Sequence, residues 1–472
     1  MNAFDFDNSE NNSDMESVVE PISDVELEIN DISDNESGTV DSLSWFDSIP
    51  ESELNDLETT IYDLMDDHLN DPAEIIKIMK PNFQNEFVSE ITHIIYQTLF
   101  DSGNCNEDAY EELKEFVEQI FEVSMDMNEI PLRSEPTNSH EAPPLHSSEI
   151  SILEEKIRDL KNIPQPPQKS KEWYEFRHGL ITASNIYKVF GTDAKYNELV
   201  YEKCKPLDLE SSERGSVNTE SPMHWGVKYE PLTILMYEKR YKTKIADFGC
   251  IPHPKYKCIG ASPDGINDDP TSPLYGRMIE IKNIFNREID GVPTEAYWTQ
   301  MQMQMEICDL NSCDFVETRF KQYGNSDEFW QDSEMKNRGI ILYFVRRDAQ
   351  SVPPLYKYMP LDIPLEEHAV NEWIDAVKLE LNSEWILFET HYWYLDEFSC
   401  VLVRRNKKWF ESAIPKIENT WNTILREREE GYDHRAAKKQ KQQVEVLSAE
   451  DGTHYIRNIP TNKPICLIKL DK

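Results

Sequence analysis

The first 50 residues contain no lysine and no arginine. They are rich in Asp, Glu, Ser and Asn, and their few apolar residues show little periodicity. A segment of this composition cannot bury enough apolar surface to offset the loss of chain entropy on folding. We therefore expect residues 1–50 to form a disordered acidic tail.

Three other features are missing from the sequence. Its 8 cysteines form no Cys-x-x-Cys pair, so the spacing does not indicate an iron–sulfur cluster and predicts reduced thiols. No apolar run reaches the roughly 18 residues that a membrane-spanning helix needs. The N-terminus is acidic and polar, unlike a secretory signal. These absences favour a soluble intracellular protein without a membrane partner.

Charge is distributed unevenly over the 472 residues, whose formal net charge is −41. Residues 1–150 contain 38 acidic and 4 basic side chains, a net charge of −34, whereas the remainder contains 51 and 44, a net charge of −7. The larger part of the chain is therefore nearly balanced. Basic clusters within it can face phosphate groups even though the whole protein is acidic.

Apolar residues recur at helical spacing from residue 51 onward. They predict a small acidic helical module over residues 51–128, for which docking onto the rest of the chain is the simplest role. Residues 129–168 are rich in proline and predict a linker that contains a short helix. A larger domain is expected over residues 169–430, followed by a basic C-terminal extension over residues 431–472.

The most informative stretch covers residues 258–283. It contains the sequence Ser-Pro-Asp-Gly, a loop rich in Asp and Pro, and the apolar run 278–282. Alternation along that run places Glu280 and Lys282 on the same face of a strand. The turn signals between the two apolar runs predict that the first folds back onto the second. Asp264 would then lie beside Glu280.

Two carboxylates and an ammonium at the end of a hairpin suit a hard divalent cation. The alternative is an ordinary turn at Asp264 followed by a solvated strand face. Two features favour the metal site. The Pro-Asp-Gly sequence constrains the direction of the aspartate, and ionised side chains inside an apolar run are costly unless they serve a metal or each other.

Two further motifs flank this stretch. The upstream motif is Trp173 followed by Arg177-His178-Gly179-Leu180-Ile181-Thr182-Ala183-Ser184, and the downstream motif is Tyr297-Trp298-Thr299-Gln300-Met301-Gln302. Asp264 and Glu280 lie 16 residues apart, and Lys282 follows on the same strand. Together these three residues resemble the PD-(D/E)XK nuclease signature. In this order the three motifs are similar to the YqaJ / lambda-exonuclease viral recombinase family. The residues of these motifs are most similar to the versions in giant DNA viruses of the mimivirus group.

The resemblance implies an α/β (α+β) fold with a restriction-endonuclease-like PD-(D/E)XK core. In such a core a mixed central sheet is flanked by helices, and here an acidic helical and disordered region would precede it. Periodicity adds helices over Thr294–Leu310, Pro364–Leu381 and Lys408–Arg428. We therefore expect the chain beyond Pro353 to be mainly helical.

The resemblance also implies a metal site. Asp264 and Glu280 would be direct ligands, and Glu230, on a helix that opens near His224, would be the third carboxylate. The main-chain carbonyl of Ile281 would add a further ligand. A site of oxygen ligands selects Mg²⁺ or Mn²⁺ over zinc. For Glu230 the alternative is a residue that only complements the helix dipole.

Two other residues complete the implied catalytic set. Lys282 would orient the attacking water and stabilise the pentacovalent phosphate by its charge. Gln300 would line the site, with Gln302 as its neighbour.

The resemblance also implies that a second group of residues binds a terminal phosphate. Arg177 and Ser184 are expected near a helix start, where free N–H groups and the helix dipole attract phosphate. In the resembled family the corresponding residues bind the 5′-phosphate of a DNA end, and we place Ser262 with them. The alternatives are a surface charge for Arg177 and a helix cap for Ser184.

Two basic runs lie near the C-terminus. Residues 404–409 mix basic and aromatic side chains, which suits a DNA backbone, and residues 435–441 are basic as well. For both runs a solvated surface is an equal alternative.

The implied function is metal-dependent hydrolysis of DNA phosphodiester bonds. The resemblance favours a 5′-to-3′ exonuclease on duplex DNA that acts in viral recombination, repair or genome processing, in the host cytoplasm or viral factory. Implied partners are DNA ends or single strands, with a single-strand annealing protein or a helicase. Related enzymes include ring-shaped trimers and monomers, so a homo-oligomer stays open. The alternatives are an endonuclease or single-strand nuclease like those of CRISPR adaptation, and a non-enzymatic scaffold that binds DNA ends.

Overall fold

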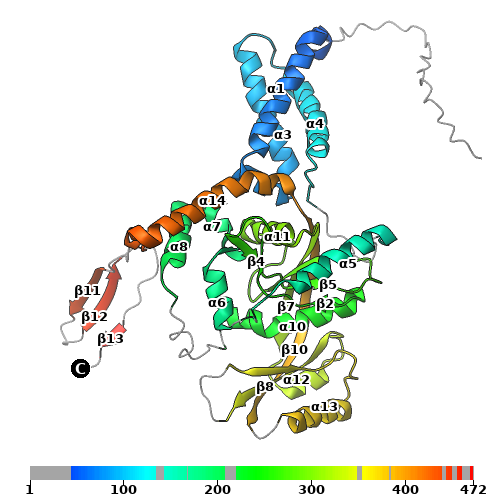
Figure 1. Ribbon diagram of the computed structural model, residues 1–472, viewed down its shortest axis with the longest axis vertical. Coiled ribbons are helices and arrows are strands. Elements are labelled where there is room, and N and C mark those ends of the chain that lie inside the picture. Colours follow the sequence, from blue (N-terminus) through cyan, green and yellow to red (C-terminus); the bar gives the residue numbers. More distant parts are fainter. Residues whose placement is uncertain are drawn as a thin grey trace, which may run out of the picture.

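The computed structural model describes residues 44–133, 143–166, 168, 170–207, 219, 221–347, 353–381 and 384–437, together with the strands at 443–448, 454–459 and 468–470. Most of the predicted acidic tail, residues 1–43, lies outside this part. Among the described helices, none is long and apolar enough to cross a membrane. Figure 1 shows a helical arm above a mixed α/β body, with a smaller lobe below the body.

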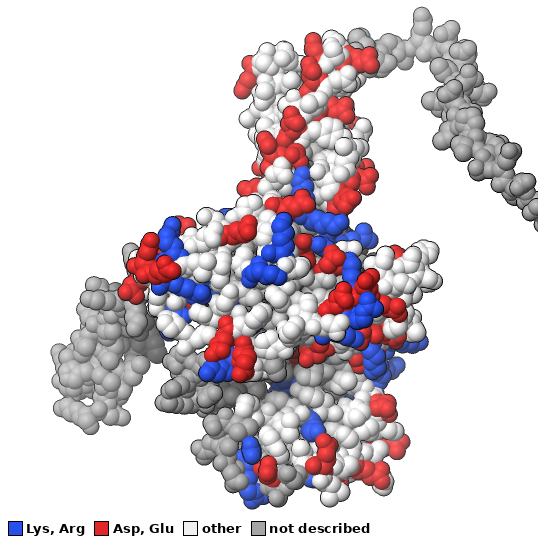
Figure 2. Space-filling model, viewed as in Figure 1, with Lys and Arg blue, Asp and Glu red and all other residues white. Residues whose placement is uncertain are grey.

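The arm, residues 44–130, is built from three long helices and two short ones. They are α1 (Glu51–Leu69), α2 (Pro72–Ile75), η2 (Ile76–Met79), α3 (Phe83–Asp101) and α4 (Ala109–Met127). Their apolar faces bury Ile61, Leu113 and Phe121 completely. Phe46 packs on Phe116 of α4 with ring centroids 5.0 Å apart, so residues next to α1 that were expected in the tail are part of the arm. Figure 2 shows Asp and Glu along its surface.

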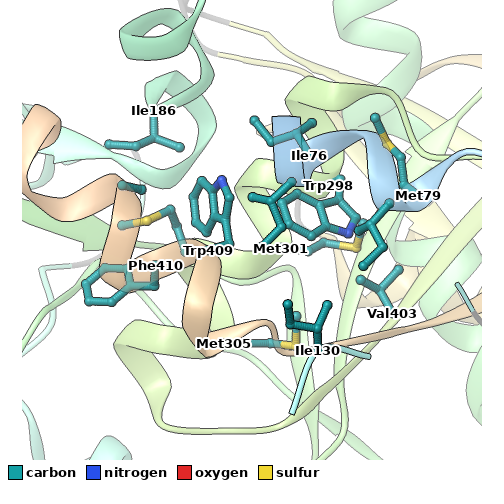
Figure 3. Close-up of a cluster of buried hydrophobic side chains, with 14 of the residues drawn as sticks. Ile76, Met79, Ile130, Ile186, Trp298, Met301, Met305, Val403, Trp409 and Phe410 are labelled. Atoms are coloured by element: carbon teal, nitrogen blue, oxygen red, sulfur yellow. The ribbon is translucent and has the colours of Figure 1, made fainter. Parts of the chain in front are cut away.

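The arm is joined to the body by an apolar cluster and by polar contacts. Ile76 and Met79 of the arm lie against Trp298 and Trp409 of the body (Figure 3). Lys408 forms an ion pair with Asp66 and donates to Asn128 of the arm at 2.9 Å. The Trp409 indole donates to the Pro72 carbonyl at 3.2 Å.

These contacts give part of the basic run at residues 404–409 a structural role. Arg405 pairs with Glu306 and Asp309, and Trp409 is fully buried. Arg405, Lys408 and Trp409 thus hold the arm and the helix that carries Glu306 in place, whereas Arg404 and Lys407 are exposed. In the second run Arg435 pairs with Glu427, whereas residues 438–441 lie outside the described residues.

The body contains a mixed sheet of seven strands in the order β2-β5-β6-β7-β10-β8-β9. These strands are β2 (Ile245–Ala246), β5 (Gly265–Asn267), β6 (Met278–Asn283), β7 (Ser312–Gln322), β8 (Arg338–Arg346), β9 (Leu355–Tyr358) and β10 (Trp385–Arg404). Only β6 and β7 are parallel to each other, and the other neighbours in this sheet are antiparallel. The mixed sheet and its flanking helices confirm the predicted fold class.

Helices pack around this sheet. They are α5 (Ser147–Asn162), α6 (Lys171–His178), α7 (Tyr187–Phe190), α8 (Asp193–Cys204), α10 (Pro222–Tyr241), α11 (Glu295–Cys308), α12 (Ser326–Gln331), α13 (Glu367–Glu380) and α14 (Lys407–Glu430). Thr294 caps α11 by accepting a hydrogen bond from the Tyr297 N–H, and Asp309 ends it in a left-handed conformation with φ of 52°. The predicted helices α11, α13 and α14 are confirmed.

Strand β10 shows that the expectation of a mainly helical C-terminal part was wrong. It has 20 residues, pairs with β8 through its first half and with β7 through its second half, and so connects the lower lobe to the body (Figure 1). Its aromatic and β-branched residues suit a strand. Most of its side chains are only half-buried, which removes the strict alternation that marks a strand in sequence.

A second sheet of three strands has the order β1-β4-β3, with β1 (Ile181–Thr182), β3 (Ile251–Pro252) and β4 (Ile259–Ala261). Strand β1 lies parallel to β4, with Thr182 opposite Gly260. The chain therefore leaves β1 and β4 on the same side. This side of the molecule carries the candidate site.

Candidate active site

Asp264 and Glu280 meet through a hairpin other than the one expected. The apolar run before Asp264 forms β4, which pairs with β1 and β3 and not with β6. The partner of β6 is β5, which starts directly after the aspartate with Gly265 opposite Ile279. A Cβ on Gly265 would lie 2.2 Å from Cγ2 of Ile245, so glycine is required here by the close approach of β2 and not by a turn.

Glu280 is held by three donors. It is fully buried, and its carboxylate accepts hydrogen bonds from Gln300 at 2.8 Å and from Gln304 at 2.7 Å. The Lys282 ammonium forms an ion pair with the same carboxylate. As the alternation predicted, Glu280 and Lys282 share one face of β6, while Ile279 and Ile281 pack into an apolar cluster on the other.

The Lys282 ammonium contacts the Glu280 carboxylate and also lies near an aromatic ring. Its Nζ is 4.7 Å from the centroid of Tyr297, on the first turns of α11. Burial disfavours the charged ammonium, but the Glu280 and Asp264 carboxylates outweigh burial and raise the pKa of Lys282 above its ordinary value. Lys282 is therefore a fixed cation at neutral pH.

Asp264 lies next to Glu280 and within electrostatic reach of Glu230. One of its carboxylate oxygens, Oδ2, accepts a hydrogen bond from the Ile281 N–H at 2.7 Å. Burial and then the Glu280 and Glu230 charges hold the pKa of Asp264 well above its usual range, against Lys282 and that N–H. Glu230 is the ninth residue of α10, too far from its first turn to serve the helix dipole.

We call Glu230, Asp264, Glu280 and Lys282 the acidic centre. The Asp264 carboxylate is buried next to Glu280 and within reach of the Glu230 charge, and for these reasons its pKa is raised. Oxygen donors with excess negative charge fit Mg²⁺ or Mn²⁺. Within the described part of the chain, however, no three Asp, Glu, His or Cys side chains converge into a ready-made cage for an ion. Donors of the protein hold Glu280 instead.

Arg177 and Ser262 come together beside the acidic centre. Nη1 of Arg177 donates to the Ser262 hydroxyl at 3.3 Å, and the guanidinium stacks 4.3 Å from the ring centroid of Trp173. The buried Cys250 thiol interacts with both Arg177 and Ser262. Burial lowers the pKa of Arg177. We call Arg177, Ser262 and Cys250 the end pocket.

The helix start expected near Arg177 and Ser184 is a short 3-10 turn followed by α7, and no side chain caps it. Arg177 lies in the last turn of α6, which Gly179 ends, so its own charge and not a helix N-terminus would attract an anion. Ser184 lies in the 3-10 turn η4 (Ala183–Asn185), exposed, with its hydroxyl 3.2 Å from that of Thr182. Because β1 and β4 run in parallel, Ser184 and Ser262 follow neighbouring strand ends.

The resemblance selected Gln300 as a residue that lines the site and did not select Gln304, and the structure places both beside Glu280. Gln304 is fully buried and bonds to Glu280 and, at 3.5 Å, to the Ser262 carbonyl. The Gln302 side chain makes other contacts. It donates a hydrogen bond to the Arg404 carbonyl at 2.9 Å and accepts one from the Asn406 N–H at 2.7 Å. The spacing of Gln300 and Gln304 at i and i+4 was the signal for a shared face.

Comparison with known families confirms the resemblance. The family described as the YqaJ-like viral recombinase domain matches residues 172–311, which include the three motifs. An uncharacterized protein of Acanthamoeba polyphaga mimivirus is 28% identical over 301 residues, which cover 56% of this chain and 54% of that protein. The chain thus spans about half the length of this relative.

Solved structures give a weaker likeness. Two crystal structures of the alkaline exonuclease LHK-Exo from Laribacter hongkongensis, one of them in complex with dAMP, have 18% sequence identity and a TM-score of 0.32. The match covers 55% of this chain and 95% of theirs. A likeness of this size supports no argument about the activity of this chain.

Proposed function

We propose that this protein is a metal-dependent deoxyribonuclease that digests one strand of duplex DNA from its 5′ end. The observation that carries the proposal is the acidic centre, in which Asp264, Glu280 and Lys282 lie at the end of the β5–β6 hairpin. The family match over residues 172–311 supports a role in recombination of DNA. The preference for 5′ ends is supported by the end pocket next to that centre.

The carboxylates of Glu230, Asp264 and Glu280 would hold Mg²⁺ or Mn²⁺, with the Ile281 carbonyl as a further ligand. The ion would polarise the phosphate and lower the pKa of a bound water.

The other residues act around that ion. Lys282 places a fixed positive charge beside the scissile phosphate and stabilises the charge that develops on it. Gln300 and Gln304 keep the Glu280 carboxylate in position through their hydrogen bonds. Arg177, Ser184 and Ser262 would bind the terminal 5′-phosphate, so that the neighbouring phosphodiester lies at the acidic centre. DNA ends are thus the proposed partner.

The test compares end-labelled linear duplex DNA with covalently closed circular DNA, in Mg²⁺, Mn²⁺ or EDTA. We expect degradation of the linear DNA only, from the 5′ end, with either metal and not with EDTA. Asp264→Ala should abolish cleavage, since the Asp264 carboxylate would bind the ion and also accepts a hydrogen bond from the Ile281 N–H of the hairpin.

Cleavage of the circle would contradict the exonuclease and leave an endonuclease. Equal cleavage in EDTA, or by the Asp264→Ala variant, would contradict the metal-dependent mechanism. A direct readout of metal binding without DNA, such as calorimetric titration with Mn²⁺, separates loss of the ion from loss of catalysis.

A further inference from the structure

Behind Arg177 lies a buried lysine that the proposed mechanism does not use. Lys203, in the last turn of α8, is 7% exposed, and its ammonium donates to the Arg177 carbonyl at 2.7 Å. Arg428 of α14 donates to the carbonyls of Lys203 at 2.7 Å and His178 at 3.0 Å. We call Arg177, Lys203 and Arg428 the cationic cluster. It joins the ends of α6 and α8.

No carboxylate among the described residues forms an ion pair with any member of this cluster. A second buried lysine makes the contrast plain. Lys188 is 6% exposed, and it pairs with Glu198 at 3.1 Å and with Glu202 at 3.0 Å. A buried ammonium that has no paired carboxylate and lies next to two half-buried cations is unfavourable, because burial removes water and each charge repels the next. A lysine needed only to cap a helix would gain from an acidic partner.

A ligand with two negative charges would balance the positive charges of this cluster. A terminal phosphate monoester carries a charge near −2 at neutral pH, since its second pKa is about 6. A phosphodiester within the strand carries a charge of −1. Arg177 alone balances one negative charge, so a second cation is needed to distinguish the end of a strand from its interior.

We propose that Lys203 is a positioning residue of the end pocket, which fixes Arg177 and supplies the second positive charge that selects a terminal 5′-phosphate over an internal phosphodiester. This inference rests on the proposed function, because it concerns the same DNA end. Lys203 acts from behind Arg177, through its hydrogen bond to the Arg177 carbonyl and through the field of its charge.

The charge of Lys203 should make this selection depend on pH. Burial, followed by the Arg177 charge, lowers the pKa of Lys203 to about 8, with Arg428 acting in the same direction and Glu202 and Cys250 against it. The ammonium is thus charged below that pH and neutral above it. The other titratable neighbours stay constant, since burial raises the pKa of Cys250 and lowers that of His178. A bound phosphate would shift the loss of charge to higher pH.

The experiment measures binding and not cleavage. Two duplexes that differ only in a 5′-phosphate or a 5′-hydroxyl are titrated by fluorescence anisotropy in EDTA, at about pH 7 and about pH 9, either side of the Lys203 pKa. For the wild-type protein we expect tighter binding of the phosphorylated end by about tenfold at the lower pH, the size of one charge-assisted hydrogen bond, and a smaller ratio at the higher pH.

Two variants separate charge from structure. Lys203→Gln keeps a donor for the Arg177 carbonyl and removes the charge, so the ratio should be low and independent of pH. Lys203→Arg keeps the charge at both pH values, so the ratio should stay high. Lys188→Gln is the matched control, a buried lysine of the same region that has its own carboxylates, and it should behave as the wild type.

An unchanged ratio in Lys203→Gln would overturn the inference and leave Lys203 as a helix cap. A wild-type ratio near one, or one that does not fall with pH, would overturn it as well, even if the variants failed to fold. Hydrolysis is tested separately with linear and circular DNA. Failure there, with end selection intact, would remove the nuclease and keep the pocket.

Discussion

The acidic centre and the cationic cluster gather charges of opposite sign, and they meet at Ser262. Gln304, which holds Glu280, also donates to the Ser262 carbonyl, while Arg177 donates to the Ser262 hydroxyl. The acidic centre has three carboxylates and one amine, whereas the cationic cluster has three cations and no carboxylate among the described residues. In each region, charges of the same sign lie close together.

The comparison teaches that burial beside like charge has the same effect on groups of either sign. The pKa values of Asp264 and Lys203 are both shifted toward the neutral form by burial and by like charges. In the proposed function a cation would relieve the first shift and an anion the second. Most other buried charges here are paired, such as Asp314 with Arg277 at 3.2 Å, and these serve the fold.

The largest effect is expected from breaking the acidic centre at Lys282. Lys282→Ala should lower the turnover of linear DNA by about 10²–10³-fold, as for loss of one charge that stabilises the transition state. The variant also leaves Glu280 buried without its cation, so thermal unfolding must be measured beside activity.

Lys357→Ala is the control, since this lysine pairs with Glu380 in the lower lobe, away from the acidic centre. It should turn over DNA like the wild type. Full activity of a folded Lys282→Ala variant would remove Lys282 from the mechanism.

The cationic side is broken most directly at Arg177. Arg177→Ala should reduce the preference for 5′-phosphorylated over 5′-hydroxyl ends by about 10–100-fold, because a charge-assisted contact to the phosphate is lost. The measurement is kcat/KM on the two substrates. Arg158→Ala, which changes an arginine with a side chain 64% exposed, should leave the preference intact. A preference equal to that of the wild type would show that the end pocket binds something else.

The junction between the two regions is tested by the glutamines of α11. Gln304→Ala should lower kcat by about tenfold, since Glu280 loses one of its fixed donors, a bond worth about 1.5 kcal/mol to a charged group. Gln302→Ala should leave kcat unchanged and lower the free energy of unfolding, because it frees the Arg404 carbonyl and the Asn406 N–H. Equal effects of the two variants on kcat would contradict the assignment of Gln304 to the site.

The smallest effect concerns the basic run that holds the arm. Lys408→Ala should lower the free energy of unfolding by about 1 kcal/mol or less, since its partner Asp66 is half exposed. It should not change affinity for DNA measured by anisotropy. Lys407→Ala, at an exposed neighbour, should change neither quantity. Weaker DNA binding by both variants would restore the interpretation of this run as a DNA track.

Much of the site could be predicted from sequence because its parts are local. The alternation of β6 places Glu280 and Lys282 on one face, and the Thr294 cap and helical spacing place Gln300 on α11. The motifs and their order led to a resemblance that the comparison confirms over residues 172–311. A pattern of this kind depends only on backbone periodicity, and nearby residues determine it.

Other features depended on residues that are distant in sequence. The sequence could not show that β4 leaves the hairpin to pair with β1, that β10 spans two neighbours, or that Trp409 is buried under the arm. In each case the periodicity describes the face of an element, while the partner across that face comes from elsewhere in the chain.

By itself, the sequence determined which chemical groups this protein has, and which of them share a strand or a helix face. The tertiary structure alone decided which charges are left without a partner. Lys188 and Lys203 are both buried lysines, yet among the described residues only Lys188 forms ion pairs with carboxylates. The cost of a buried charge depends on the solvent and the charges around it, and these are set by the packing of distant segments.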